Sequence, residues 1–372
     1  MKNFFHILLS IISHLAPKRN IILFNSGKLP SDNPYALYQY ILSDVRYSNY
    51  VFVWYVEKGA EKSKIPLDIK NEKRCKIISS KLKLEYYNVI CKAVIHSHGW
   101  ASRKLYPKKL PISVNLWHGL PIKKIGLDVS SEQKIYKDDY FMISSEYFDR
   151  FFSSSMNVER DNIVRLGQPR NDWLFYNVEN KTERYVVWMP TFKKSMYDNR
   201  VNDGINELNK VSFLDFKKAD RLNRELSRFD IKLYIKLHPF DTLNLADFPV
   251  LSNIEVLKST DVRISGDKLY KFLSSSSALI SDYSSIVFDY ALLNRPICID
   301  KFSCDTYSRE LYFKFDDVIS NYYTVTNVEE LEKFITNIGK HENTKLTSHV
   351  SIVDKHGENS NSIAEFILGK LE

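Results

Sequence analysis

The stretch ALISDYSSIVFDYALL, from Ala278 to Leu293, decides the fold class of this 372-residue chain. Its first four residues, ending at Ser281, have the length and composition of a buried strand. The polar residues DYSS follow, and a helix is predicted from Ser284 to Leu293. A strand that leads directly into a helix is the repeating unit of α/β proteins with parallel sheets.

The same alternation continues on both sides of this stretch. In the first half, strands are predicted at Ile21–Asn25, Tyr50–Val56, Ala93–His96, Val114–Trp117, Phe141–Ser144 and Ile163–Leu166, and helices at Pro34–Leu42 and Leu84–Lys92. In the second half, strands are predicted at Tyr185–Met189, Lys232–Leu237 and Pro296–Asp300, and helices at Phe213–Arg228 and Leu269–Leu273. We therefore expect an α/β protein of GT-B type, with two Rossmann-like domains facing a central cleft.

The domain boundary is expected between Trp173 and Arg184, which gives domains of residues 19–176 and 177–372. Residues 1–18 form a separate expected element. The segment Asn3–Ala16 is rich in Phe, Leu and Ile, but it is shorter than the about 20 apolar residues that span a bilayer. Its polar residues fall on one side of a helix, and Lys18 follows, which is typical of a helix lying in the membrane interface. The alternative is a helix packed on its own domain.

The charge and the cysteine and histidine spacing of the chain limit the kinds of ligand that it is expected to bind. The formal net charge is +8, which favours anionic partners such as nucleic acid, acidic lipid or phosphorylated substrates. There is no RNA-recognition signature and no zinc-finger spacing, so nucleic acid is not expected. The four cysteines form no C-x-x-C pair, no H-E-x-x-H segment is present, and no acidic cluster demands Mg²⁺. The sequence thus indicates neither a metal nor a cofactor.

Five segments place polar, Gly or Pro residues directly after a predicted strand, where open α/β sheets bind ligands. They are Trp117-His118-Gly119-Leu120-Pro121, Gly167-Gln168-Pro169-Arg170-Asn171-Asp172, Pro190-Thr191-Phe192, Lys236-Leu237-His238-Pro239 and Ser281-Asp282-Tyr283-Ser284-Ser285. One such junction carries little information, but five in two sheets indicate a built site.

Ser284 and Ser285 stand where a helix begins. A helix N-terminus offers unpaired N–H groups and a partial positive charge, which suit a diphosphate, although plain capping is the simpler function for serine. Asp289 follows one helical turn later on the same face, where it meets a donor hydroxyl or faces solvent.

His118 and His238 end one strand in each predicted domain. Histidine titrates near neutral pH and can accept a proton from an attacking hydroxyl or donate one to a leaving phosphate. Arg170 can bind phosphate bidentately, with a surface ion pair to Asp172 as the alternative. His96 and His98 also end a strand and are interpreted as structural. The segment Ser31-Asp32-Asn33-Pro34 is interpreted as a helix cap.

These five motifs, in this order, resemble the CDP-glycerol glycerophosphotransferase family of teichoic acid synthesis. The resemblance runs from about Ile21 to the region of Asp300, and Asp32-Asn33-Pro34 also fits it. Leu120 stands where the family often has Thr, and the length of the chain resembles the short members that add one or a few units. The family's two important histidines match His118 and His238.

The resemblance implies transfer of glycerol phosphate or ribitol phosphate from a CDP-polyol to an acceptor hydroxyl on a lipid-linked saccharide or growing polymer. It also implies peripheral association with the cytoplasmic face of the membrane and its anionic lipid. The first domain is then the acceptor domain and the second the CDP-donor domain. The expected donor-binding residues are Arg170, Thr191, Asp282, Ser284, Ser285 and Asp289.

Two alternatives stay open at this point. One is a GT-B glycosyltransferase that uses a nucleotide sugar, which shares the fold but releases a nucleoside diphosphate. The other is a non-catalytic protein that binds lipid or polymer, which turns over no nucleotide donor. Fold alone does not distinguish them.

Overall fold

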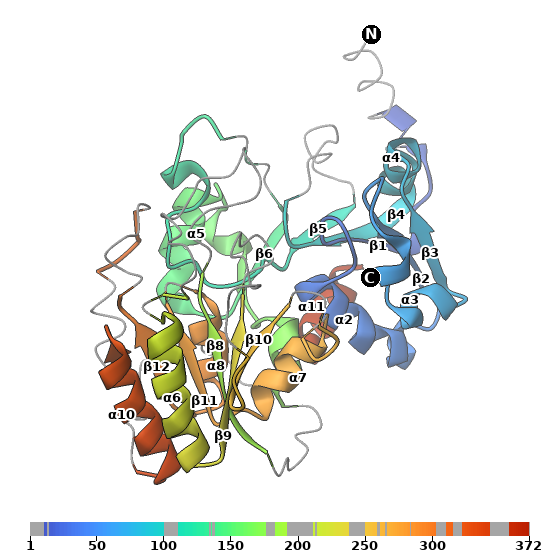
Figure 1. Cartoon of the computed structure of the whole chain (residues 1–372). Helices are drawn as coiled ribbons and strands as arrows, with labels where there is room; N and C mark the ends of the chain where they lie inside the picture. Colours follow the sequence, from blue (N-terminus) through green and yellow to red (C-terminus); the bar gives the residue numbers. More distant parts are fainter. Residues whose placement is uncertain are drawn as a thin grey trace. The chain divides into compact units, whose positions relative to one another are not determined.

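The computed structural model describes residues 11–12, 15–99, 111–133, 135, 138–175, 183–191, 211–212, 214–237, 250–258, 261–264, 266–282, 284–302, 310–314, 322–342 and 357–371. The chain forms two compact units (Figure 1). Unit 1 comprises residues 1–120, 125–173 and 353–372, and unit 2 comprises residues 121–124 and 174–352.

Unit 1 contains a parallel sheet with the strand order β3-β2-β1-β4-β5-β6-β7 in the part of the chain that the structure describes. Its strands are β1 (Arg19–Asn25), β2 (Val51–Tyr55), β3 (Cys75–Ile78), β4 (Cys91–His96), β5 (Ile112–Asn115), β6 (Tyr140–Ile143) and β7 (Ile163–Arg165). The order runs outward from β1 and then restarts at β4 on its other side. The carboxyl ends of β1 and β4 therefore form a topological switch point, which is where such sheets bind ligands.

The α-helices described in unit 1 are α2 (Asp32–Ser43), α3 (Leu67–Asn71), α4 (Lys81–Ile90), α5 (Asp149–Ser155) and α11 (Asn359–Leu371). Helix α11 packs beside α2, although it lies at the other end of the sequence (Figure 1). Asp172 fixes its first turn, because the carboxylate accepts hydrogen bonds from the backbone N–H groups of Asn359, at 2.9 Å, and Ser360, at 2.7 Å. The expected second domain included these residues, and the structure packs them in unit 1.

Gly167 shows how closely α11 approaches. A Cβ atom at this position would lie 1.9 Å from Oδ1 of Asn359, and the backbone has φ +85°, which a residue with a side chain rarely adopts. Glycine is therefore required where the Gly-Gln-Pro-Arg turn meets the start of α11.

Unit 2 contains a second parallel sheet, with the order β10-β9-β8-β11-β12-β13 in the described residues. Its strands are β8 (Arg184–Met189), β9 (Ile231–Lys236), β10 (Ile254–Leu257), β11 (Ala278–Ser281), β12 (Ile297–Asp300) and β13 (Tyr323–Val325). Its described α-helices are α6 (Phe216–Arg228), α7 (Lys268–Ser274), α8 (Ile286–Ala291) and α10 (Val328–Gly339). The switch point here lies between β8 and β11.

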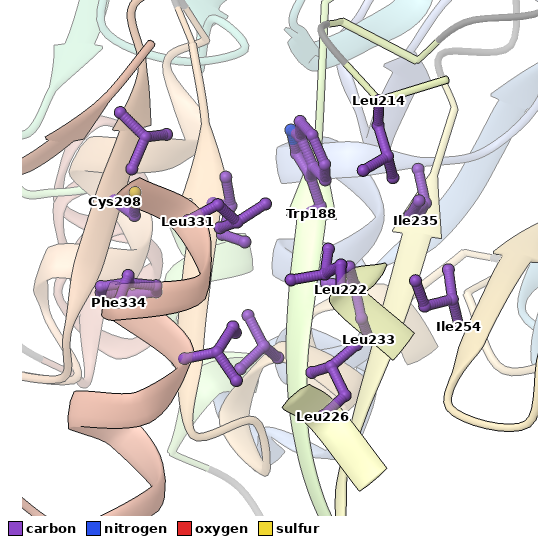
Figure 2. Packing of buried hydrophobic residues seen from close by; sticks show 14 of the residues in the cluster. Trp188, Leu214, Leu222, Leu226, Leu233, Ile235, Ile254, Cys298, Leu331 and Phe334 are labelled. Carbon is purple, nitrogen blue, oxygen red and sulfur yellow. The ribbon is translucent and has the colours of Figure 1, made fainter. Parts of the chain in front are cut away.

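One face of this second sheet carries the main hydrophobic cluster (Figure 2). Leu222 and Leu226 of α6, together with Leu331 and Phe334 of α10, are fully buried against strand residues that include Trp188. Their spacing of three to four residues places them on one side of each helix. Each buried side chain of this kind contributes about 1.5–3 kcal/mol, so the cluster anchors both helices.

The fold expected from the sequence is confirmed as an α/β protein with two parallel, Rossmann-like units. The pattern did not predict strands β3, β10 and β13 or helices α3, α5, α10 and α11. No helix within the described residues is long and apolar enough to cross a membrane.

Candidate active site

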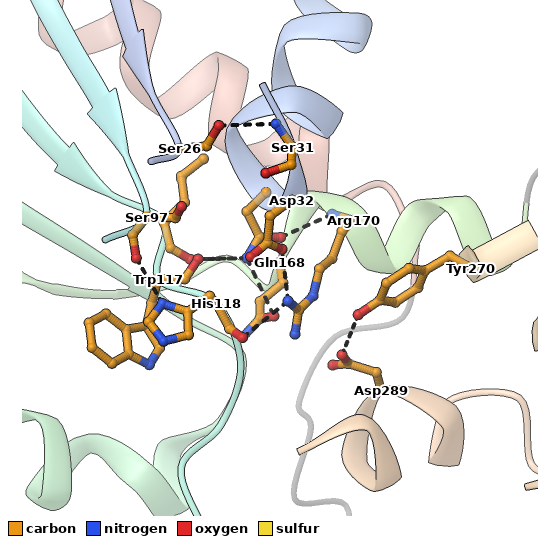
Figure 3. A network of polar contacts seen from close by, with 12 residues as sticks. Ser26, Ser31, Asp32, Ser97, Trp117, His118, Gln168, Arg170, Tyr270 and Asp289 are labelled. Carbon is orange, nitrogen blue, oxygen red and sulfur yellow. Dashed lines mark hydrogen bonds and ion pairs between the residues drawn. The ribbon is translucent and has the colours of Figure 1, made fainter. Parts of the chain in front are cut away.

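His118 lies in the loop after β5, at the carboxyl edge of the unit 1 sheet (Figure 3). Its ring is stacked between two other rings, with centroid distances of 4.1 Å to Trp117 and 4.7 Å to His98. Nδ1 lies 2.9 Å from the carbonyl oxygen of Ser97, in the loop after β4. Two neighbouring strand ends thus hold one imidazole in place.

These contacts define the protonation state of His118. A carbonyl oxygen can only accept a hydrogen bond, so Nδ1 carries the proton and Nε2 keeps its lone pair. Burial lowers the pKa of the His118 imidazole below its usual value; Arg170 lowers it further, while the bond to Ser97 and the Asp32 carboxylate act in the opposite direction. The ring is therefore neutral at neutral pH, as a general base must be.

Asn33, in the first turn of α2, connects two loops behind this histidine. Its buried amide Nδ2 donates to the carbonyl oxygens of Leu116, at 3.2 Å, and Trp117, at 2.9 Å. Its Oδ1 accepts from the backbone N–H of Arg170, at 3.1 Å. The helix-cap interpretation of Asp32-Asn33-Pro34 is wrong for Asn33, because its side chain bonds to distant loops instead of its own helix.

Arg170 completes the same network. Its Nη1 lies 2.7 Å from Oδ1 of Asp32 and donates to the carbonyl oxygen of His118 at 3.1 Å (Figure 3). The guanidinium is buried, so this ion pair is shielded from water. The alternative of a surface pair with Asp172 is wrong, since Asp172 bonds to the start of α11.

The other two histidines of this edge differ in their surroundings. His96 is fully buried, and its Nε2 lies 2.8 Å from Asp138, which fits the structural interpretation. His98 is exposed, and its ring stacks on that of His118 with an interplanar angle of 10°. Although part of this side chain is open to solvent, the groups packed around the ring desolvate it. That effect, together with the neighbouring His118, lowers the pKa of His98 to about 4, so it is uncharged when His118 is neutral.

In unit 2, Asp282 and Thr191 meet at the switch point between β8 and β11. The Asp282 carboxylate accepts from the Thr191 backbone N–H, at 3.0 Å, and from its hydroxyl, at 2.8 Å. Burial raises the pKa of Asp282, and the bonds from Thr191 oppose that effect. Asp282 therefore fixes the turn that Thr191 occupies after β8.

Ser284 and Ser285 precede α8 as expected. The Ser285 side chain makes no capping hydrogen bond to the helix, so its hydroxyl does not serve the simpler function of a cap. Asp289 does not face solvent: it is buried, and its Oδ2 accepts a 2.7 Å hydrogen bond from the Tyr270 hydroxyl of α7 (Figure 3).

Other predicted features lie outside the described residues. They are His238 and most of the amphipathic segment that ends at Ala16. Among the described residues, no group of three or more His, Cys, Asp or Glu side chains could hold a metal ion.

Comparison with known proteins identifies the family of the chain. The sequence pattern of the CDP-glycerol:poly(glycerophosphate) glycerophosphotransferase family matches residues 7–368. The chain belongs to this family. It is a transferase that acts on polyol phosphates, as the motifs predicted.

Individual relatives agree. The chain is 28% identical over 329 residues to a teichoic acid glycerol-phosphate transferase of Staphylococcus aureus (strain NCTC 8325 / PS 47), covering 79% of this chain and 77% of the relative. It is 25% identical to a teichoic acid poly(glycerol phosphate) polymerase of Bacillus spizizenii (strain ATCC 23059 / NRRL B-14472 / W23), and the match covers 98% of this chain and 96% of the relative. The solved structure of the wall teichoic acid polymerase TagF matches with a TM-score of 0.73 and 18% identity, covering 98% of this chain and 93% of that one, which supports the GT-B fold.

Proposed function

We propose that this glycerophosphotransferase moves glycerol phosphate from CDP-glycerol to a hydroxyl of a lipid-linked saccharide or a growing teichoic acid or capsule polymer, and releases CMP. The observation that carries the proposal is His118, a neutral imidazole whose Nδ1 is bonded to Ser97 and whose Nε2 lone pair can accept a proton. CDP-ribitol is the alternative donor, since family membership covers polyol phosphates in general.

In the proposed reaction, Nε2 of His118 takes the proton of the acceptor hydroxyl. The oxygen then attacks the β-phosphorus of the donor, and a phosphodiester bond forms. The bond between that phosphorus and the bridging oxygen breaks, and the oxygen leaves with CMP. Positioning and charge stabilisation supply most of the catalysis in phosphoryl transfer, so few catalytic groups are needed.

The donor is assigned to unit 2 and the acceptor to unit 1. Ser284 and Ser285, with the N–H groups at the start of α8, donate to the diphosphate, and Thr191 is held beside them by Asp282. Asp289 is proposed to bind a hydroxyl of the nucleotide, with Tyr270 orienting its carboxylate. His238 is proposed to neutralise phosphate charge and to donate a proton to the leaving group. Arg170 was also expected to bind phosphate, but its guanidinium pairs with Asp32 in unit 1, so we assign it to holding the His118 loop.

The enzyme is proposed to work at the cytoplasmic face of the membrane as a peripheral protein. The apolar segment before Ala16 and the basic residues Lys18 and Arg19 suit anionic inner-leaflet lipid, which adds about 1 kcal/mol for each nearby basic residue. Vesicle sedimentation with a chain that starts at Arg19 tests this: the shortened chain should fold and lose lipid binding. Equal binding by the shortened chain excludes the segment as the anchor.

The decisive experiment incubates the protein with CDP-glycerol, CDP-ribitol and a set of nucleotide sugars, each with a lipid-linked disaccharide acceptor. We expect CMP and a phosphodiester product from one CDP-polyol. Release of a nucleoside diphosphate with a glycosidic product would instead establish a glycosyltransferase.

A further inference from the structure

Lys236 is a basic residue at the unit 2 sheet edge that no step above uses. It is the last residue of β9, the strand that pairs with β8. Ile235 pairs with Trp188, so Lys236 lies level with Met189, which in turn pairs with Ser281 of β11. Lys236 is thus one strand away from Thr191 and two strands away from the segment that precedes α8.

The face of the sheet to which Lys236 belongs follows from the alternation of strand side chains. Leu233 and Ile235 lie in the hydrophobic cluster under α6 and α10. Tyr234, on the opposite face, packs against Phe272 of α7. Because strand side chains alternate, Lys236 belongs to the face of Tyr234 and α7, away from the main hydrophobic cluster.

The ammonium of Lys236 has no counter-charge in the part of the chain that the structure describes. Lys232, four residues earlier on the same face of β9, lies 3.1 Å from the carboxylate of Glu183. Lys236 forms no such ion pair and is half-buried. Burial lowers the pKa of Lys236 to about 8, with desolvation as the cause. A cation placed this way is costly to the folded protein unless an anion arrives to pair with it.

We propose that Lys236 binds the diphosphate of the nucleotide donor as a point charge. The inference rests on the proposed function and adds to it a cation on the donor side of the reaction. Lysine is suited to this role because its ammonium is compact and can serve phosphate oxygens in several directions. The diphosphate would supply the counter-charge for Lys236 that the described residues do not supply.

A pH dependence follows with a definite sign. Only the protonated ammonium attracts phosphate, and a bound phosphate raises the pKa of Lys236 above its value of about 8 in the free protein. Donor binding near pH 8.5 should therefore take up protons, and donor affinity should fall as the pH rises above 8. Below pH 7 the lysine is already charged, so this uptake should vanish.

The test is calorimetry of CDP-glycerol or CDP-ribitol binding to the full chain, in two buffers of different ionisation enthalpy. Lys236→Met should raise the donor dissociation constant about 10- to 100-fold and abolish proton uptake at pH 8.5. The midpoint of thermal unfolding of Lys236→Met should not fall, because the substitution removes a desolvated charge. Lys236→Arg should keep much of the affinity and lose the pH dependence. Lys232→Met, on the same strand, is the matched control and should bind the donor normally.

Unchanged donor affinity and proton uptake in Lys236→Met overturn the inference while leaving the proposed function intact, provided that the wild-type protein still releases CMP. A lower midpoint with unchanged affinity also overturns it, since Lys236 is then structural. A wild-type protein that binds no CDP-polyol overturns both proposals.

Discussion

The carboxyl edges of the two sheets hold their polar groups in different ways. In unit 1, His118 is surrounded by groups that bond to one another: Ser97 fixes its ring, Asn33 fixes its loop, and Arg170 pairs with Asp32. In unit 2, Asp282 and Thr191 form a bonded pair, but Ser285 makes no cap and Lys236 has no counter-charge in the described residues.

This difference corresponds to two kinds of chemical task. A general base must be held in one position and one tautomer before the substrate arrives, and a misplacement of about 1 Å can cost 100-fold in rate. A phosphate site must instead leave donors and positive charge unsatisfied until the ligand binds. The bonded sheet edge of unit 1 suits the proposed general base, and the sheet edge of unit 2 suits the proposed phosphate site.

The largest effect is expected from removing the base itself. His118→Ala should lower kcat by about 10²- to 10⁴-fold, because the variant loses the proposed general base. The affinity for CDP-glycerol should be almost unchanged, since the donor is assigned to unit 2. Single-turnover CMP release measures the rate, and circular dichroism confirms the fold. A variant with near-normal turnover removes His118 from the mechanism.

Breaking the support behind the base should have the next largest effect. Asn33→Asp keeps the size of the side chain but replaces the Nδ2 donor with an oxygen facing the carbonyl oxygens of Leu116 and Trp117. The lost and opposed hydrogen bonds should displace the His118 loop and lower kcat about 10- to 100-fold. The donor dissociation constant should stay near that of the wild type.

Asp172→Asn provides the matched control, because Asp172 is also buried in unit 1 and accepts from the first N–H groups of α11. It should lower the free energy of unfolding by about 1–3 kcal/mol and leave kcat of the folded protein unchanged. If both variants lose kcat in proportion to stability, Asn33 has no specific role in holding the base.

The comparison also shows what the sequence could predict. The sheet-edge positions of His118, Ser284 and Ser285 could be predicted, because a strand followed by polar residues places them there whatever the remaining packing. Asn33 was misread because Ser31-Asp32-Asn33 has the local pattern of a cap, and only the fold brings the loops after β5 and β7 to its amide. Strand β3 was missed because it is only four residues long and the exposed Lys76 interrupts its apolar run, as is usual at a sheet edge.

A double variant tests the proposed phosphate site at the carboxyl edge of the unit 2 sheet. Ser284→Ala combined with Ser285→Ala should raise the donor dissociation constant about tenfold, because two hydroxyl donors to the diphosphate are lost. The thermal midpoint should hardly change, since Ser285 makes no capping bond. Calorimetry and thermal unfolding measure the two quantities. Unchanged affinity with a lower midpoint would show that these serines serve only the helix.

The smallest effect expected is a shift in the pH profile. Burial lowers the pKa of His118, so its neutral, proton-accepting form persists below pH 6.5. The rate should therefore be lost only as the pH falls through this lowered pKa, so the acid limb of the kcat profile should lie below pH 6.5. The Asp32 carboxylate raises the pKa of His118 against the effect of burial.

Asp32→Asn should accordingly lower the pKa of His118 and move the acid limb of the kcat profile to lower pH, by a fraction of a pH unit. Arg170, no longer paired with a carboxylate, should lower the pKa of His118 as well. Profiles of kcat between pH 4.5 and 8, measured on both proteins at constant ionic strength, check the direction. An acid limb above pH 6.5 in the wild type, or one that moves upward in Asp32→Asn, contradicts the assignment of His118 as a preorganised neutral base. The polar groups at the sheet edge of unit 1 would then resemble those proposed for unit 2, whose charge is balanced only when the substrate binds.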